Sequence, residues 1–141
     1  MTKKISIIKP DCFNGYYLDA GISTRKGGVS ENGYASLNFG FNSGDKPVNV
    51  VKNRELLYQE LKISEKHVVY ANQVHSDKIA LVTQKDGGKG AISREEALDG
   101  IDAMITQEKN VYLTIQTADC MSIFIYCPES HSIGLVHAGW K

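Results

Sequence analysis

A cysteine thiol and a histidine imidazole stand at the two open ends of a predicted hairpin. Residues 122–126 and 133–136 are strand-like, and the short segment 127–132 joins them. A connection this short makes the strands antiparallel neighbours, because a parallel pair needs a crossover of a dozen residues or more. Cys120 and His137 therefore lie opposite each other or one step diagonal, with Cβ atoms about 5–8 Å apart.

This pair permits three interpretations. In the first, both side chains bind one metal ion, since zinc binds cysteine sulfur and histidine nitrogen. In the second, they are a nucleophile and its base. In the third, they are a buried pair without a chemical role, because free cysteine is often a small core residue. His75 favours the first interpretation, since it lies in a predicted turn between two strands. With Cys120 and His137 it would form a three-ligand site with an open fourth position, the arrangement of catalytic zinc.

The remaining histidines and the nearest cysteine fit this site less well. Cys127 is seven residues beyond Cys120, and an odd separation along one strand places two side chains on opposite faces. His67 and His131 fall at a strand start and in the hairpin loop, where solvated side chains are expected. Asp119, directly before Cys120, either ends the strand or acts as a general acid and base or as an outer partner of a ligand histidine.

Two further segments resemble anion-binding elements. Arg25 precedes a glycine turn and could bind an anionic group bidentately, although a surface arginine is the simpler interpretation. The segment 85–90 contains glycines and lysines, but it lacks the Gly-Lys-Ser/Thr ending and opens no helix. We therefore expect a flexible loop there.

The elements that must position these residues are mostly short strands. A strand over 16–24 leads into a glycine turn, a long polar loop covers 30–44, and one helix is expected over 48–61. Asn49 or Asp45 would cap that helix. Its apolar stripe would consist of Val50, Val51, Leu57 and Leu61. The other strands are expected at 68–71, 79–83, 103–106, 111–117, 122–126 and 133–136. One helix among so many strands predicts an α+β fold with a mostly antiparallel or mixed sheet.

Composition excludes several classes of protein. Of the residues, 42% are hydrophobic and 23% are charged, as in an ordinary globular chain. Sixteen basic residues balance sixteen acidic ones, so the basic excess of a nucleic-acid-binding domain or a polybasic membrane contact is absent. The expected partner is a small molecule.

The expected location is a reducing cytoplasm. The apolar stretch near the N-terminus, residues 5–8, is shorter than the roughly 7–15 residues of a signal peptide, and no run approaches the roughly 20 residues of a membrane span. The three cysteines are an odd number without zinc-ribbon spacing, so we expect free thiols.

Six sequence blocks, in order, resemble one family. They are Thr24-Arg25-Lys26-Gly27-Gly28-Val29-Ser30, Ser36-Leu37-Asn38-Phe39-Gly40, Asn72-Gln73-Val74-His75, Asp99-Gly100-Ile101-Asp102-Ala103, Thr117-Ala118-Asp119-Cys120 and His137-Ala138-Gly139-Trp140. The family is that of the polyphenol oxidase or laccase-domain proteins, also described as purine nucleoside phosphorylases and as peptidoglycan editing factors. The resemblance spans nearly the whole chain.

The resemblance implies a site, a fold and a set of activities. The family's metal ligands correspond to His75, Cys120 and His137, and its fold is a mixed α/β sandwich. Members are associated with phosphorolysis of adenosine, inosine and methylthioadenosine to a free base and a sugar 1-phosphate, with adenosine deamination, and with copper-dependent phenol oxidation. Because family members continue past the His-Ala-Gly-Trp block, we expect a single domain over 1–141 that is truncated after that block.

The leading hypothesis is a zinc-dependent purine nucleoside phosphorylase and adenosine deaminase that binds a purine nucleoside and phosphate. In it, Asp119 moves a proton, Arg25 steers phosphate and Asn38 makes a polar contact. The alternatives are a hydrolase that edits a cell-wall precursor with Cys120 as nucleophile, a copper-dependent oxidase, and a metal-binding fragment without turnover. Four histidines are too few for a multicopper oxidase. Oligomeric state is not indicated.

Overall fold

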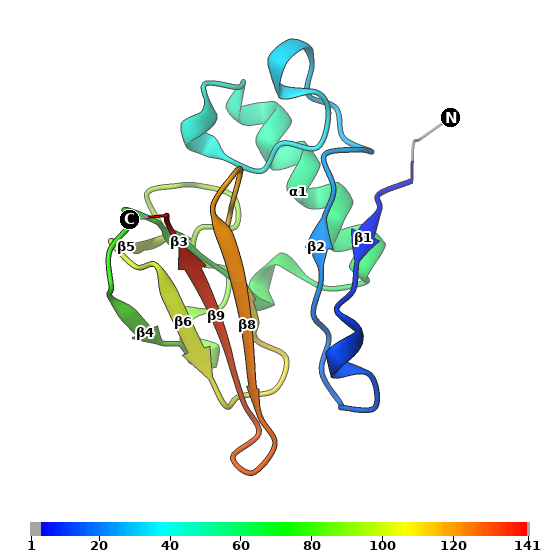
Figure 1. The fold of residues 1–141 in the computed structure, drawn as a ribbon. Helices are drawn as coiled ribbons and strands as arrows, with labels where there is room; N and C mark the ends of the chain where they lie inside the picture. Colours follow the sequence, from blue (N-terminus) through cyan, green and yellow to red (C-terminus); the bar gives the residue numbers. More distant parts are fainter. Residues whose placement is uncertain (1–3, 141) are drawn as a thin grey trace. The chain divides into compact units, whose positions relative to one another are not determined.

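The computed structural model describes residues 4–140, which form two compact units divided between Lys62 and Ile63 (Figure 1). The single-domain organisation stays a prediction.

The first unit contains one short ribbon and the helix. Strands β1 (Ile7–Ile8) and β2 (Ile22–Ser23) pair antiparallel, with Ile7 opposite Ser23. The α-helix α1 spans Pro47–Leu61, within one residue of the prediction. Single 3₁₀ turns form at η1 (Asp11–Phe13), η2 (Asn32–Tyr34) and η3 (Phe41–Ser43). The strand expected over 16–24 is reduced to β2, and the polar loop over 30–44 contains the last two of these turns.

The buried face of α1 is half polar, which corrects part of the predicted apolar stripe. Val50 is buried as predicted, but Leu61 is exposed, and Asn53 and Arg54 are buried in addition. The reason is that the helix packs on a loop whose carbonyls accept side-chain hydrogen bonds: Asn53 Nδ2 donates to the Asn38 carbonyl at 2.8 Å, and Arg54 Nη2 donates to the Phe39 carbonyl at 2.7 Å. The predicted caps are also wrong, because the N-cap is Lys46, without a side-chain cap.

The second unit consists of two sheets. Its strands are β3 (Val68–Asn72), β4 (Ile79–Leu81), β5 (Leu98–Asp99), β6 (Ala103–Thr106), β7 (Tyr112–Thr114), β8 (Met121–Cys127) and β9 (Ser132–Ala138), with 3₁₀ turns η4 (Glu65–His67) and η5 (Gln84–Asp86). One sheet has the order β5-β3-β7 and is parallel. The other has the order β4-β6-β9-β8, in which only β4 and β6 are parallel.

A buried cluster joins the two sheets. Val69 of β3 and Met104 of β6 meet there with Val82 and Val111. The fold is therefore a mixed α/β arrangement with one helix and a two-sheet sandwich, which confirms the predicted fold class. Across residues 4–140, no helix is long and apolar enough to cross a membrane.

Most predicted strands are confirmed, with changed ends. The strand over 103–106 is reproduced as β6, whereas those over 79–83 and 111–117 shorten to β4 and β7. β5 was not predicted, because a strand of two residues is too short to show an alternation of apolar and polar side chains.

One face of the four-stranded sheet is apolar and exposed. Ile79 and Ile123 belong to one cross-strand row, and Leu81, Ile105 and Ile125 to the next. The members of this apolar sheet face are Ile79, Leu81, Ile105, Met121, Ile123 and Ile125, each between 38% and 72% exposed. Contiguous apolar patches of this kind are uncommon on soluble monomers.

Lysine at Ile125 is expected to change the surface without changing stability. Ile125 lies on edge strand β8 and is half exposed, and lysine is tolerated on edge strands. The free energy of unfolding should stay within about 0.5 kcal/mol of wild type. Binding of the dye ANS should fall, as measured by fluorescence of the folded protein. A loss of more than about 2 kcal/mol would mean that Ile125 is packed.

Candidate metal centre

The hairpin of β8 and β9 positions two of the three candidate ligands. Ser122 lies opposite His137 and Met121 opposite Ala138, so Cys120, two residues before Ser122, is diagonal to His137. This is the second of the two registers allowed by the sequence. His137 is buried, and Cys120 is half-buried.

His75 enters from the turn that follows β3. Its backbone is left-handed, with φ of 61°, a conformation that a residue with a Cβ adopts only at a cost. The turn is fixed on one side by Gln73, whose side chain exchanges two hydrogen bonds of 2.8 Å with the backbone of Gln116. His75 is thereby placed beside the hairpin, as its predicted turn position suggested.

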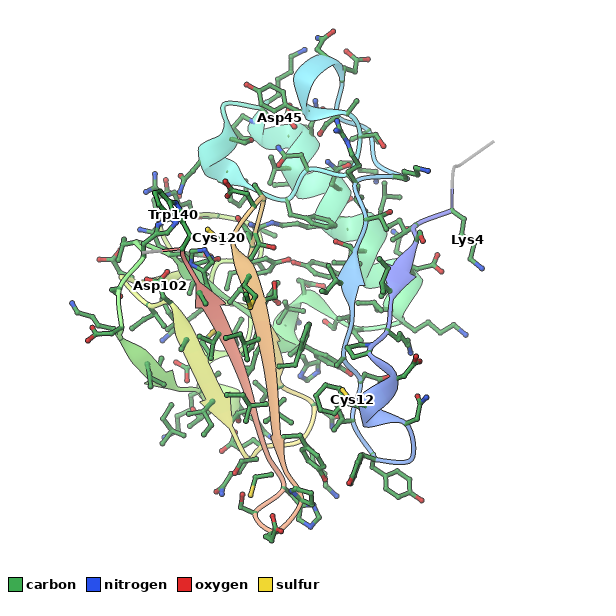
Figure 2. All side chains as sticks on the ribbon, viewed as in Figure 1. Lys4, Cys12, Asp45, Asp102, Cys120 and Trp140 are labelled. Carbon is green, nitrogen blue, oxygen red and sulfur yellow. The ribbon has the colours of Figure 1, made fainter. Side chains whose placement is uncertain are left out.

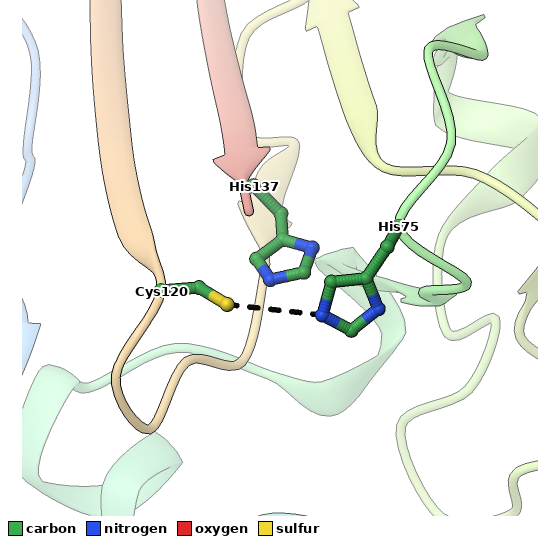
Figure 3. A group of neighbouring side chains, drawn as sticks. All are labelled: His75, Cys120 and His137. Atoms are coloured by element: carbon green, nitrogen blue, oxygen red, sulfur yellow. Dashed lines mark hydrogen bonds between the residues drawn. The ribbon is translucent and has the colours of Figure 1, made fainter. Parts of the chain in front are cut away.

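The three side chains converge on one point (Figure 3). One ligand atom from each of His75, Cys120 and His137 lies within 4.8 Å of the other two. The Cys120 Sγ atom is 3.7 Å from His75 Nε2, and the two imidazole rings are edge to face with centroids 4.7 Å apart. Within residues 4–140 this is the one group of three or more such side chains with ligand spacing.

A buried carboxylate, Asp102, supports both histidines. It lies with Cys120 at one end of the four-stranded sheet (Figure 2). Its Oδ1 atom is 2.7 Å from His137 Nδ1 and accepts the backbone N–H of His75 at 3.0 Å. Its Oδ2 atom accepts the backbone N–H groups of Val74 at 3.1 Å and of Ser76 at 2.7 Å.

The environment moves two pKa values in opposite directions. Burial would raise the pKa of the Asp102 carboxyl, but hydrogen bonds from His137, Ser76 and Val74 outweigh it and hold that pKa well below its usual range. Burial and the neighbouring Asp119 carboxylate raise the pKa of the Cys120 thiol. Both a nucleophilic cysteine and a metal-binding cysteine act as the thiolate, so the raised pKa does not separate these two roles.

The role of Asp102 was not predicted from the sequence, where this residue was noted only as part of one of the six family blocks. Its place follows from the pairing of β6 with β9, where Ala103 faces Val136 and the His137 N–H donates to the Asp102 carbonyl at 2.8 Å. The sequence feature that could have indicated Asp102 was an acidic residue immediately before an apolar strand.

The other candidate residues lie where local structure uses their polar groups. Arg25 is exposed in the first unit, and its Nε and Nη2 atoms donate to the Ala35 carbonyl at 2.8 and 2.6 Å. Asn38, in the same unit, donates to Ser43 Oγ at 2.8 Å and to Asp45 Oδ2 at 3.1 Å.

Asp119 and the excluded cysteine are in the second unit. Asp119 is exposed and accepts a hydrogen bond from the Cys120 thiol at 3.8 Å. Cys127, at the far end of β8, donates to Glu129 Oε2 at 3.3 Å and is not in the ligand group. The loop over 85–90 overlaps turn η5 and forms an ion pair between Lys89 and Asp86 at 2.7 Å.

Alanine at Gly139 should disturb His75. A Cβ atom there would lie 3.2 Å from His75 Cδ2, so the ring must shift by a few tenths of an ångström. We expect zinc affinity to fall about 3- to 10-fold, or roughly 0.6–1.4 kcal/mol, by competition with a chelator. Alanine at Gly134 is the control, because its Cβ makes only an ordinary contact of 3.4 Å with Ile125. Equal affinity of the two variants would contradict the prediction.

Comparison with known proteins gives a family and several relatives. Residues 19–141 match the family model described as multi-copper polyphenol oxidoreductase laccase. The chain is 43% identical over 128 residues to purine nucleoside phosphorylase YlmD of Bacillus subtilis, covering 91% of this chain and 46% of that protein. It is 36% identical over 124 residues to a purine nucleoside phosphorylase of Staphylococcus aureus, covering 88% and 47%.

Solved structures show the same fold. YlmD from Geobacillus stearothermophilus superimposes with a TM-score of 0.83 at 39% identity, over 85% of this chain and 44% of that one. YfiH from Bacillus licheniformis gives a TM-score of 0.83 at 36% identity, over 85% and 45%. The chain thus spans less than half the length of these relatives.

Proposed function

This chain belongs to the multi-copper polyphenol oxidoreductase laccase family, and we propose that it supplies the zinc centre of a purine nucleoside phosphorylase, with His75, Cys120 and His137 as ligands. The observation that carries the proposal is the convergence of their donor atoms within 4.8 Å. The substrate class comes from the relatives, which are named purine nucleoside phosphorylases.

The donor set fits zinc. Zinc bonds of about 2.0–2.3 Å in a tetrahedron put ligand atoms roughly 3.3–3.6 Å apart, and Cys120 Sγ is already 3.7 Å from His75 Nε2. The ligand atoms, which lie within 4.8 Å of one another, would have to draw closer for all three to bind one zinc ion. Three protein ligands leave one position for a water or substrate, as in catalytic rather than structural zinc sites.

Individual residues of the chain would then have separate roles in the two reactions. Zinc supplies Lewis acidity and lowers the pKa of water. Asp119, exposed beside Cys120, would take a proton from water as its oxygen bonds to the amine-bearing carbon of adenosine, and would return a proton to the amine, which leaves as ammonia. In phosphorolysis, phosphate attacks the anomeric carbon of the ribose and the base leaves. We assign Arg25 to steering the phosphate, since a guanidinium binds such groups bidentately, and Asn38 to a polar contact.

Two other chemistries have an observation in their favour. A site of two histidines and one cysteine also suits a single copper ion, and the family description names copper; the four histidines of the chain are too few for a multicopper oxidase. The short distance from Cys120 to His75 would suit a hydrolase that edits a cell-wall precursor. A metal-binding chain without turnover is the remaining alternative. The free thiols of Cys12, Cys120 and Cys127 agree with a reducing cytoplasm, which we propose as the location.

The deciding experiment measures both reactions with zinc-loaded protein. Inosine with phosphate should give hypoxanthine and ribose 1-phosphate, and adenosine should give inosine and ammonia. Substitution His75→Ala should reduce both rates at least 100-fold, whereas His131→Ala, in the exposed hairpin turn, should not.

The alternatives give different results. Covalent trapping of metal-free protein at Cys120 by an electrophilic amide analogue would support the hydrolase, and phenol oxidation by copper-loaded protein would support the oxidase. Zinc-loaded protein that turns over neither nucleoside would contradict the proposal.

A further inference from the structure

We propose that Asp102 is the positioning residue of the metal centre, because one carboxylate fixes both histidine ligands. It would hold the ring proton of His137 on Nδ1, which leaves Nε2 free to bind metal, and it would shape the turn that carries His75. This inference rests on the proposed metal centre, but the tautomer of His137 can be tested without any metal.

The first step concerns which nitrogen of His137 carries the proton. Three backbone N–H groups, from Val74, His75 and Ser76, point at the Asp102 oxygens at 2.7–3.1 Å. A carboxyl group surrounded by donors is best satisfied as an ionised acceptor. The Nδ1 atom of His137, 2.7 Å from Oδ1, must therefore donate, so in the neutral ring the lone pair is on Nε2.

The second step concerns the direction of that lone pair. Figure 3 shows that the nitrogen of His137 farther from the backbone points toward Cys120 and His75. His137 is buried and lies in the last part of β9, so its ring has little freedom to turn away. A histidine that donates its other N–H to a carboxylate is the usual arrangement of a ligand histidine.

The third step concerns the turn of residues 74–76. Consecutive backbone N–H groups around a left-handed residue form a concave anion-binding nest. Here the left-handed residue is His75, with φ of 61°, and the bound anion is the side chain of Asp102. The carboxylate offsets the cost of this backbone conformation, so the place of the His75 ring depends on Asp102.

The orientation of His137 and the turn at His75 both depend on one atom. Oδ1 of Asp102 faces both His137 Nδ1 and the His75 N–H, and it thereby ties together ligands from distant parts of the chain. Cys120 is placed separately, by the β8–β9 register. Loss of the charge on Asp102 should therefore disturb the two histidines and leave Cys120 in position.

The substitution Asp102→Asn tests this most sharply. The amide has one acceptor and one donor in place of two acceptors. With its oxygen toward Val74 and Ser76, which supply two backbone donors to Oδ2, its NH₂ must occupy the Oδ1 position and donate to His137 Nδ1. The ring proton then moves to Nε2, the ligand atom.

Two measurements are needed. Nitrogen-15 NMR of the imidazoles, without metal and above the titration range of histidine, should show His137 protonated on Nδ1 in wild type and on Nε2 in the variant. Zinc affinity, by competition with a chelator, should fall about 10- to 100-fold in Asp102→Asn. The matched control is Asp99→Asn, an exposed carboxylate that bonds Asn72, which should keep wild-type affinity.

The outcomes separate this inference from the proposed function. Wild-type His137 protonated on Nε2 would overturn the role of Asp102, and this measurement needs no variant to fold. Unchanged zinc affinity in folded Asp102→Asn would also overturn it. Wild-type protein that binds no zinc would overturn the proposed function instead, while the tautomer result would still decide whether Asp102 orients His137.

Discussion

Replacing Cys120 with alanine is expected to remove zinc from the protein while leaving it folded. Wild type should hold about one zinc ion per chain, because three donor atoms lie within 4.8 Å of one another. Loss of the only sulfur donor should cost more affinity than the roughly 10- to 100-fold of an outer-shell change. Elemental analysis of purified protein, with wild type beside the variant, measures this directly.

The chain offers a matched control in Cys127. That thiol lies on the same strand β8 and is also half-buried, but it is outside the ligand group. Cys127→Ala should retain the metal. Cobalt substitution gives a second readout, since the thiolate-to-metal absorption should vanish in Cys120→Ala and persist in Cys127→Ala. Equal metal content in the two variants would refute Cys120 as a ligand.

The identity of the metal must be measured in protein as purified, not by comparing affinities. Copper(II) binds most nitrogen and sulfur sites more tightly than zinc does, so a higher affinity for copper would say nothing about the metal the protein carries. Copper found in place of zinc in protein purified from cells would favour the oxidase alternative.

The sequence was most informative where positions depend on local connections. The short hairpin connection brought Cys120 and His137 together, and the observed register, with Ser122 opposite His137, agrees with one of the two options. His75 was found from its turn position. All three residues were also indicated by the family resemblance.

Features that depend on distant pairings were not predictable. Asp102 reaches His137 because β6 pairs with β9, although β7 and β8 lie between them in the chain, and no connection length specifies that pairing. The two buried polar residues of α1 were missed for another reason. Apolar periodicity cannot identify buried residues such as Asn53 and Arg54, whose burial is offset by hydrogen bonds to loop carbonyls.

A second large effect is expected in the first unit, at Gly28. A Cβ atom there would overlap the Ser36 carbonyl oxygen and Asn53 Oδ1 and would lie 2.5 Å from Leu37 Cα. These contacts cannot relax cheaply, because two of the three atoms belong to the backbone. Asn53 is fully buried and also accepts the N–H of Val29 at 2.8 Å. Displacing Asn53 would break the hydrogen bonds that hold this loop against α1.

We therefore expect Gly28→Ala to lower the free energy of unfolding by about 3 kcal/mol or more, at the high end for a single substitution. Gly33→Ala is the control, because that position has no atom within 4 Å of its Cβ and needs no positive φ; it should be neutral or stabilising by about 0.4–1 kcal/mol. Urea unfolding followed by helical circular dichroism reports on this unit, since α1 is the one α-helix within residues 4–140. If both variants unfolded at the same urea concentration, the close packing of Gly28 against residues 36 and 37 would be wrong. The explanation of why polar Asn53 is buried between α1 and this loop would then be wrong as well.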